Sequence, residues 1–280
     1  MSEVLVTVLI AVYNEEKYIA KCIESIAKQT YSPIEIIVID DGSTDKTAKA
    51  AQEFKFVKLI SLGHTGKANA INFGAAKANG EILFFLDGDM YFKKDYVTRM
   101  SEPIISGKYI GTCHTDEYVA NPDNIWSKCL QLKSGLPHDK RLHIDSVFEN
   151  EGSIVYRAIK KEIFIKSGGF ENRGYLDDQT LYPKIGEKAQ FVRGAVCYHY
   201  NPETLNEVFY SGKWGGKSIA ISSGPSSVLK FSPILSLIRS FIMGFKYKYA
   251  PMVIYEFVYE LGIFFGITEF LFGREKVYGK

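Results

Sequence analysis

Residues 82–89 read Ile-Leu-Phe-Phe-Leu-Asp-Gly-Asp, an apolar run that ends in two carboxylates separated by one glycine. An uninterrupted apolar run of this length, closed by a turn signal, predicts a buried central strand. Asp87 and Asp89 are two positions apart, so both side chains can lean toward the same side where the chain leaves the sheet. Two like charges this close are unfavourable unless a cation or a hydrogen-bond donor lies between them. The alternative interpretation is an ordinary Asp-Gly turn.

The residues around this strand predict an α/β fold. Apolar, β-branched runs at 4–12, 34–39 and 57–62 predict three further strands, and apolar residues at helical spacing predict helices between them. This alternation is typical of an open, mostly parallel sheet flanked by helices. In the less regular second half, the patterns predict strands at 109–114, 152–156 and 190–198 and helices at 121–133 and 176–185.

The chain changes character after residue 225. Val228–Phe245 and Ala250–Phe272 are apolar, aromatic stretches, and the second is long enough to span a bilayer. It carries Glu256, Glu260 and Glu269, and charges at mid-depth are costly, so an amphipathic helical hairpin on the membrane surface is favoured over two spans. The alternatives are a soluble helical pair packed on the domain and a homodimer interface.

The composition limits the size, the partners and the cellular location of the protein. The 280 residues suffice for one large α/β domain with an appendage, and 46% hydrophobic residues can form a full core. A net charge of +2 argues against a nucleic-acid partner. The four cysteines lack metal-like spacing, which predicts buried free thiols in a reducing cytosol. No signal peptide is visible, and a cytoplasmic location is expected.

Further polar motifs follow the predicted strands. Asp40 and Asp41 could accept hydrogen bonds from a nucleotide base or ribose, although turn chemistry and helix capping explain the same residues. Lys67 at a helix start could meet a phosphate with the help of the helix dipole, or it could be a solvated surface lysine. Asp87 and Asp89 suit Mg²⁺ or Mn²⁺ carrying a diphosphate, with Gly88 allowing the phosphates to approach.

Taken together, the motifs resemble family 2 glycosyltransferases of the GT-A fold. The matching segments occur in the family's order and are Val8–Glu15, Ile37–Asp45, Gly66–Asn72, Asp87–Asp89, Glu151–Ser153 with Tyr156-Arg157, and Gly168–Phe170. The resemblance implies an inverting enzyme that uses a nucleoside-diphosphate sugar and a divalent metal. It implies donor contacts by Ala11, Tyr13, Glu15, Asp41, Gly66, Lys67, Asn69, Asp87 and Gly88, acceptor contacts by Gly152 and Ser153, and metal ligation by Asp89 with Asp87 and His199.

Two positions in this assignment have alternatives. Leu176-Asp177-Asp178-Gln179 resembles the family's Glu-Asp motif with Asp177 in the Glu position. Inverting transfer needs a carboxylate that takes the acceptor proton, and we assign Asp178 to this role, with Asp177 as the alternative base or as a residue that orients the acceptor. His199 follows the last predicted strand and is interpreted either as a metal ligand or as a structural histidine.

Residues 212–216 faintly resemble the Gln-x-x-Arg-Trp segment of processive family members. Tyr210 replaces the glutamine and Lys213 replaces the arginine, which argues against a long-chain polymerase and for transfer of a single sugar. Trp214 could stack on a sugar ring, and Lys213 could help to neutralise the leaving diphosphate.

We therefore predict a GT-A domain over residues 1–225, with a nucleotide-sugar half at 1–115 and an acceptor half at 116–225, followed by amphipathic helices at 226–280. The expected enzyme moves a hexosyl or N-acetylhexosaminyl group from a UDP- or GDP-sugar to a hydroxyl or phosphate of a lipid-linked or saccharide acceptor. It is expected to associate, peripherally or monotopically, with the cytosolic face of the cell membrane, and a homodimer is possible.

Two other functions would use a similar α/β sheet. A nucleotidyltransferase would carry a glycine-rich basic loop after the first strand, where this chain has Val12-Tyr13-Asn14-Glu15. A non-catalytic subunit that binds sugar nucleotides or assembles on the membrane would have the same fold, but the intact Asp87, Asp89 and Asp178 argue against it.

Overall fold

The computed structural model describes residues 4–142 and 151–273, and the chain divides into two compact units. Within the described residues, the first unit comprises 4–118, 142, 151–171 and 177–199, and the second comprises 119–141, 172–176 and 200–273.

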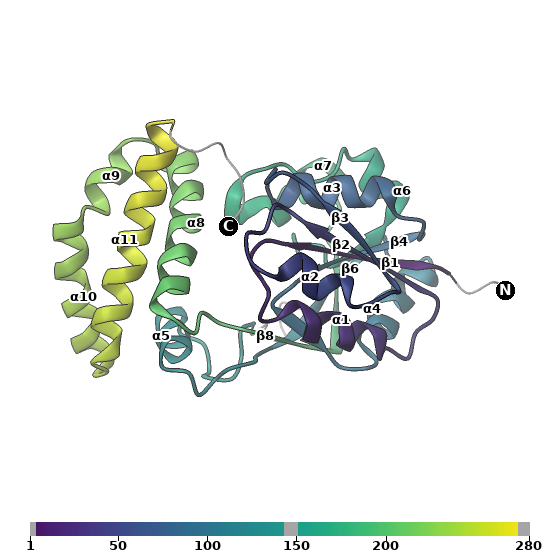
Figure 1. Ribbon diagram of the computed structural model, residues 1–280, viewed down its shortest axis with the longest axis horizontal. Helices are drawn as coiled ribbons and strands as arrows, with labels where there is room; N and C mark the ends of the chain where they lie inside the picture. The colour runs from purple at the N-terminus through teal and green to yellow at the C-terminus, as the bar shows by residue number, and fades with distance from the viewer. Residues whose placement is uncertain (1–3, 143–150, 274–280) are drawn as a thin grey trace. The chain divides into compact units, whose positions relative to one another are not determined.

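The first unit is built on one eight-stranded sheet with the strand order β3-β2-β1-β4-β7-β6-β8-β5 (Figure 1). Its strands are β1 (Val6–Val12), β2 (Ile34–Asp40), β3 (Val57–Ser61), β4 (Ile82–Asp87), β5 (Met90–Phe92), β6 (Gly111–Val119), β7 (Ala158–Lys160) and β8 (Gln190–His199). The pairs among β1 to β4 are parallel, whereas β4–β7, β6–β7 and β5–β8 are antiparallel. The predicted open sheet is confirmed, but it is parallel only through its first four strands.

The register of β1 brings the polar motifs to one edge of the sheet. Ala11 lies opposite Ile39 on β2 and opposite Asp87 on β4. Because parallel strands end on the same side, the residues that follow β1, β2 and β4 meet at this edge. The edge therefore gathers three of the segments on which the family resemblance depends.

Helices cover both faces of this sheet. They are α1 (Ile19–Ala27), α2 (Thr47–Gln52), α3 (Lys67–Lys77), α4 (Tyr96–Ile105), α6 (Lys161–Lys166) and α7 (Tyr182–Ile185). Val8 and Ile10 pack with α1 and α4 in one apolar cluster, whereas Leu9 packs with α3 and α6 in another, as the alternation of a strand requires. The four cysteines of the chain are buried and free, as predicted.

Three sequence-based element predictions need correction. The strand predicted at 152–156 is wrong: β7 begins at Ala158, and Ser153 forms only an isolated bridge with Ala189. The helix predicted at 176–185 is divided into a 3₁₀ turn, η2 (Gly174–Gln179), and α7. The helix predicted from residue 121 is α5 (Ile125–Ser134), which begins later because the Asn124 side chain caps the Trp126 and Ser127 amides.

The second unit is helical. Besides α5 it contains α8 (Leu205–Ser223), α9 (Ser226–Lys230), α10 (Pro233–Tyr247) and α11 (Pro251–Leu271). Among the described residues, α11 is the one helix long and apolar enough to cross a membrane. It is nevertheless the central helix of this unit, because Met252, Tyr255, Ile263 and Ile267 on it are buried.

Glycines and ion pairs explain how α11 is accommodated. A Cβ atom added at Gly216 on α8 would lie 2.3 Å from the Ile263 carbonyl oxygen, so the two helices touch backbone to backbone. Glu256 pairs with Lys133 at 2.7 Å and Glu260 pairs with Arg239 at 2.6 Å. The charges that argued against a membrane span are thus neutralised inside the helical unit.

Candidate active site

Asp87, the last residue of β4, is held between two cations. Its Oδ2 atom lies 3.0 Å from Arg157 Nη1, and its Oδ1 atom accepts a short hydrogen bond from Lys67 Nζ. Burial alone would raise the pKa of Asp87, but Lys67 and Arg157 hold it far below its ordinary range. This carboxylate is therefore ionised, and its negative charge is shared by two positive groups.

Asp41 fixes the loop that carries Lys67. Its Oδ1 atom accepts from the Thr65 amide at 2.6 Å, and its Oδ2 atom accepts from the Gly66 amide at 2.7 Å. Gly66 has a φ of 94° at the start of α3, a conformation that glycine adopts without strain. The buried Asp41 carboxylate thus positions the first turn of α3, and its predicted contact with the nucleotide stays a prediction.

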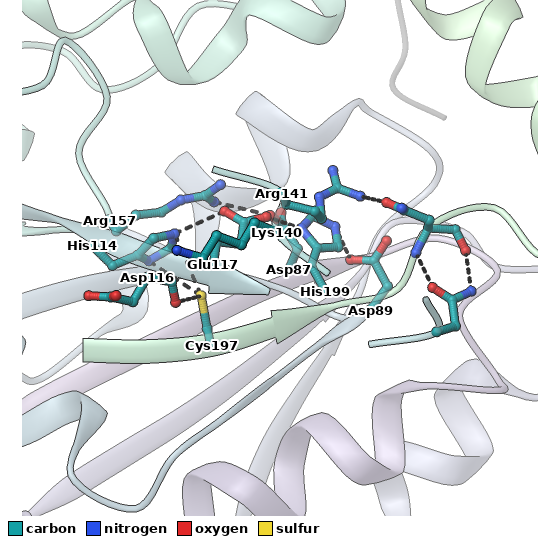
Figure 2. A network of polar contacts seen from close by, with 12 residues as sticks. Asp87, Asp89, His114, Asp116, Glu117, Lys140, Arg141, Arg157, Cys197 and His199 are labelled. Carbon is teal, nitrogen blue, oxygen red and sulfur yellow. Dashed lines mark hydrogen bonds and ion pairs between the residues drawn. The ribbon is translucent and has the colours of Figure 1, made fainter. Parts of the chain in front are cut away.

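Asp89 faces His199 across the β5–β8 pair. Met90 lies opposite His199 in the register, which brings the His199 Nε2 atom to 3.2 Å from Asp89 Oδ1. The other ring nitrogen, Nδ1, lies 2.7 Å from Glu117 Oε1 (Figure 2). An ionised carboxylate only accepts hydrogen bonds, so Nδ1 of His199 is the donor.

The hydrogen bonds continue inward from Glu117 on β6. Its Oε2 atom lies 3.0 Å from His114 Nε2, and His114 Nδ1 lies 2.8 Å from the Tyr96 hydroxyl. Burial would raise the pKa of Glu117, but its hydrogen bonds with His114 and His199 hold the pKa well below its ordinary range. Burial lowers the pKa of His114, which favours its neutral ring. Glu117, His114 and Tyr96 were not predicted from the sequence as residues of the site.

The residues at Asp89 fit a divalent cation. With its Nδ1 proton on Glu117, a neutral His199 ring points an unprotonated Nε2 at the Asp89 carboxylate. A carboxylate oxygen and an imidazole nitrogen 3.2 Å apart are joined either by a proton on Nε2 or by a cation, and this pair of ligands suits Mn²⁺. His114, Glu117 and Cys197 also lie within ligand distance of one another, but hydrogen bonds already join His114 to Glu117.

The other predicted donor residues lie near the same edge of the sheet. The Tyr13 ring packs on His64 with centroids 4.3 Å apart, and the Glu15 amide donates to the Thr47 hydroxyl at 2.7 Å. Asn69 is exposed and donates to the Thr65 carbonyl at 2.8 Å. A Cβ at Gly88 would lie 2.6 Å from Val12 Cγ1, so packing against β1 already requires a glycine there, apart from any approach of phosphates.

The structure distinguishes Asp177 from Asp178. Asp177 is buried, and its backbone carbonyl accepts from the Thr180 amide and hydroxyl. Asp178 is half-buried, and its charge acts on the cations of the site. Burial would lower the pKa values of Lys67 and Arg157, but Asp87 and, more weakly, Asp178 raise them. Asp178 is therefore, like Glu117, close enough to act on a cation of the Asp87 cluster.

The predicted acceptor residues are divided between the two units. Ser153 pairs with Ala189 through two backbone hydrogen bonds of 2.8 Å, and Gly152 beside it has a φ of 70°. Lys213 and Trp214 lie on α8 in the helical unit, where Lys213 pairs with Glu269 at 2.7 Å and Trp214 packs edge-on against Tyr175.

Comparison with known proteins decides the family. The family model described as glycosyl transferase family 2 matches residues 7–168. This chain belongs to that family. Glycosyltransferase GlyG of Streptococcus pneumoniae is 29% identical over 200 residues, which are 65% of each protein. The matches cover between 15% and 65% of the first curated relatives, so this chain spans less than two thirds of their length.

Solved structures share the GT-A fold of this family 2 chain. Mannosyltransferase PcManGT of Pyrobaculum calidifontis, crystallised with GDP-Man and Mn²⁺, gives a TM-score of 0.58 at 18% identity, with 98% of this chain and 89% of that chain covered. Staphylococcus aureus TarS 1–349, crystallised with UDP-GlcNAc, gives a TM-score of 0.57 at 14% identity, with 96% and 92% covered. The predicted family and fold are confirmed, and the Mn²⁺ in the mannosyltransferase agrees with the predicted cofactor.

Arg157, Glu117, His114 and Tyr96 were not among the predicted site residues. A signal for Arg157 exists in the Tyr156-Arg157 pair of the family resemblance, and Glu117, His114 and Tyr96 have no comparable signal. These three residues lie on β6 and α4, far away in sequence from His199.

The two aspartates of the family's D-x-D motif are expected to differ in their effect on stability. Asp87→Asn removes the nearest counter-charge of Lys67 and Arg157 and should lower the free energy of unfolding by about 2 kcal/mol. This is below the usual cost for a buried pair, because Lys67 keeps 34% of its side-chain surface exposed. Asp89→Asn removes a like charge that acts on Asp87, so this variant should not lower the free energy of unfolding. Urea unfolding of both variants checks this, and equal destabilisation would contradict the described ion pairs.

Proposed function

We propose that this family 2 chain is an inverting glycosyltransferase that moves a single sugar from a nucleoside-diphosphate sugar to a hydroxyl or phosphate acceptor. One observation carries the proposal: the Asp89–His199 pair lies beside the Asp87–Lys67–Arg157 cluster, and Asp178 acts electrostatically on that cluster. A displacement at a sugar diphosphate needs a metal site and two cations for the leaving diphosphate. It also needs a separate carboxylate that can take the acceptor proton.

Asp89 and His199 would hold the divalent cation. When bound, Mn²⁺ or Mg²⁺ supplies positive charge that stabilises the diphosphate as it leaves. Lys67 and Arg157, oriented by Asp87, would bind phosphate oxygens, and the Lys67 ammonium stands at the amino end of α3, where the helix dipole favours an anion. Asp87 thus serves the donor site through these two cations.

Asp178 would act as the general base. The acceptor oxygen attacks the anomeric carbon, the bond from that carbon to the diphosphate oxygen breaks, and the acceptor proton passes to Asp178. Attack opposite the leaving group inverts the anomeric configuration. Asp177, buried in its own turn, would hold the backbone of this segment.

The donor class follows from similarity. UDP-GlcNAc in the TarS structure and GDP-Man in the mannosyltransferase structure support a UDP- or GDP-linked hexose or N-acetylhexosamine. A poly-β-1,6-N-acetyl-D-glucosamine synthase of Staphylococcus aureus is 26% identical over 259 residues. The ring pair of Tyr13 and His64 and the loop fixed by Asp41 would receive the nucleotide.

Calorimetric titration with UDP, GDP, CDP and dTDP, with and without Mn²⁺, tests the donor site. One nucleotide should bind tightly with Mn²⁺, and binding should collapse without metal or in Asp89→Ala. Asp178→Asn should bind the same nucleotide unchanged but lose about 10²- to 10⁴-fold in donor turnover, since it removes the base alone. Binding of no nucleotide by the folded protein would overturn the enzyme assignment and favour a non-catalytic subunit.

The acceptor is proposed to be lipid-linked, because the helical unit carries a surface suited to a membrane. On α10 the residues at spacing i, i+4, i+7 and i+11, which are Ile234, Ile238, Phe241 and Phe245, are 51% to 81% exposed. The opposite face of the same helix buries Ser236 and Ser240 completely. The helix therefore hides its serines and presents its largest apolar side chains to the outside.

Such an arrangement is unfavourable in water unless the outer face is covered. Lys230 lies just before α10, Lys246 at its end and Lys248 just after it, and the three lysines are exposed. Their charge complements anionic headgroups, at about 1 kcal/mol for each lysine near the surface. We assign the α10 face to the cytosolic surface of an anionic bilayer, with α10 in the plane of the interface and α11 inside the helical unit.

Vesicle binding tests this assignment. The protein should sediment with phosphatidylcholine vesicles that contain phosphatidylglycerol. A charge on the exposed side of α10, either Phe245→Glu or Ile242→Glu next to Phe241, should weaken binding by about tenfold or more. Phe56→Glu is the matched control, because Phe56 and Ile242 are both 58% exposed and Phe56 lies in the sheet unit. If Ile242→Glu left vesicle binding intact and instead dissociated a dimer in ultracentrifugation, the α10 face would belong to a second copy of the chain.

A further inference from the structure

We propose that Glu117, held in place by His114 and Tyr96, is a positioning residue that makes His199 a metal ligand with a fixed tautomer. The proposal rests on the metal site proposed above and extends it to three buried residues that make no contact with Asp89 in the described hydrogen bonds. It concerns the orientation of His199, and it assigns no reacting atom to Glu117, His114 or Tyr96.

The direction of each hydrogen bond follows from the geometry of Glu117, whose two oxygens each face one imidazole nitrogen. Because a carboxylate only accepts, His199 donates from Nδ1 to Oε1, and His114 donates from Nε2 to Oε2. A neutral His114 then accepts at Nδ1, and the Tyr96 hydroxyl is the donor at 2.8 Å. Each of these three contacts is thus assigned one proton.

This arrangement leaves His199 with one orientation. Its proton is committed to Glu117 on Nδ1, so the lone pair of a neutral ring is on Nε2, which faces Asp89 at 3.2 Å. A carboxylate behind a ligating histidine fixes the tautomer and increases the basicity of the ligating nitrogen. Without Glu117, the His199 ring could carry its proton on Nε2 and donate to Asp89, which would occupy the place of the metal.

His114 and Tyr96 explain why Glu117 keeps its own position. All three side chains are buried, and His114 occupies the Glu117 oxygen that His199 does not use. A buried carboxylate with only one of its oxygens bonded would be costly. The hydrogen bond from His114 therefore stabilises the Glu117 carboxylate in the position that His199 requires. The buried histidine–glutamate–cysteine group is thus accounted for as the support of His199.

The experiment measures Mn²⁺ affinity of the UDP-loaded protein from the free Mn²⁺ signal in electron paramagnetic resonance. Glu117→Gln cannot accept from both imidazoles and should weaken Mn²⁺ binding by about 10- to 100-fold. Tyr96→Phe removes the outermost donor and should weaken it by about three- to tenfold, the fold-change expected for one hydrogen bond. Tyr156→Phe is the control: Tyr156 is equally buried, and its hydroxyl donates to the Glu187 carbonyl, outside this chain of residues.

Pulsed electron paramagnetic resonance adds a readout that general destabilisation would not change. Bound Mn²⁺ should show ¹⁴N coupling from His199 in the wild type and in Tyr156→Phe, and the coupling should fall in Glu117→Gln. If Asp89→Ala abolishes Mn²⁺ binding but Glu117→Gln and Tyr96→Phe both keep the wild-type affinity and ¹⁴N coupling, the positioning role is overturned. If Asp89→Ala also bound Mn²⁺ normally, the metal site itself would be wrong. Should Glu117→Gln fail to fold, the Tyr96→Phe and Tyr156→Phe pair decides the question.

Discussion

The first unit depends on the compensation of buried carboxylates at one edge of its sheet. Asp87 ends the central strand among apolar residues, and it is stable there because Lys67 and Arg157 supply positive charge. That requirement fixes the first turn of α3 and the chain just before β7. It also prepares a place for an anion, since two cations held at one carboxylate keep further donor capacity for phosphate oxygens. The same interaction thus stabilises the sheet edge and orients the two cations of the proposed donor site.

The sequence allowed prediction of what depends on local pattern. The apolar run at 82–86, the acidic strand ends and the glycine before Lys67 identified the fold, the family and the parallel half of the sheet. It did not identify Arg157, Glu117 or His114, because their positions depend on antiparallel pairing between segments far apart in sequence, and register of that kind leaves no periodic signal. His199 was predicted as a residue, whereas its tautomer and its partner Glu117 required the geometry.

The helical unit shows a second limit of pattern. Apolar length in α11 is equally typical of a membrane span and of a core helix, and the ion pairs of Glu256 and Glu260 favour the core helix. In α10, periodicity reveals an apolar face but does not say what that face touches. Because small and polar residues of α10 pack inward, its isoleucines and phenylalanines point out, and the proposed membrane contact is assigned to α10.

The central claim is that Asp89 and His199 hold the metal that carries the donor diphosphate. Anomalous diffraction near the manganese edge, from crystals grown with UDP and Mn²⁺, tests this claim most directly. The account predicts one strong anomalous peak in contact with the Asp89 carboxylate, His199 Nε2 and the diphosphate. A peak among His114, Glu117 and Cys197, or UDP bound with no peak at Asp89, would contradict it.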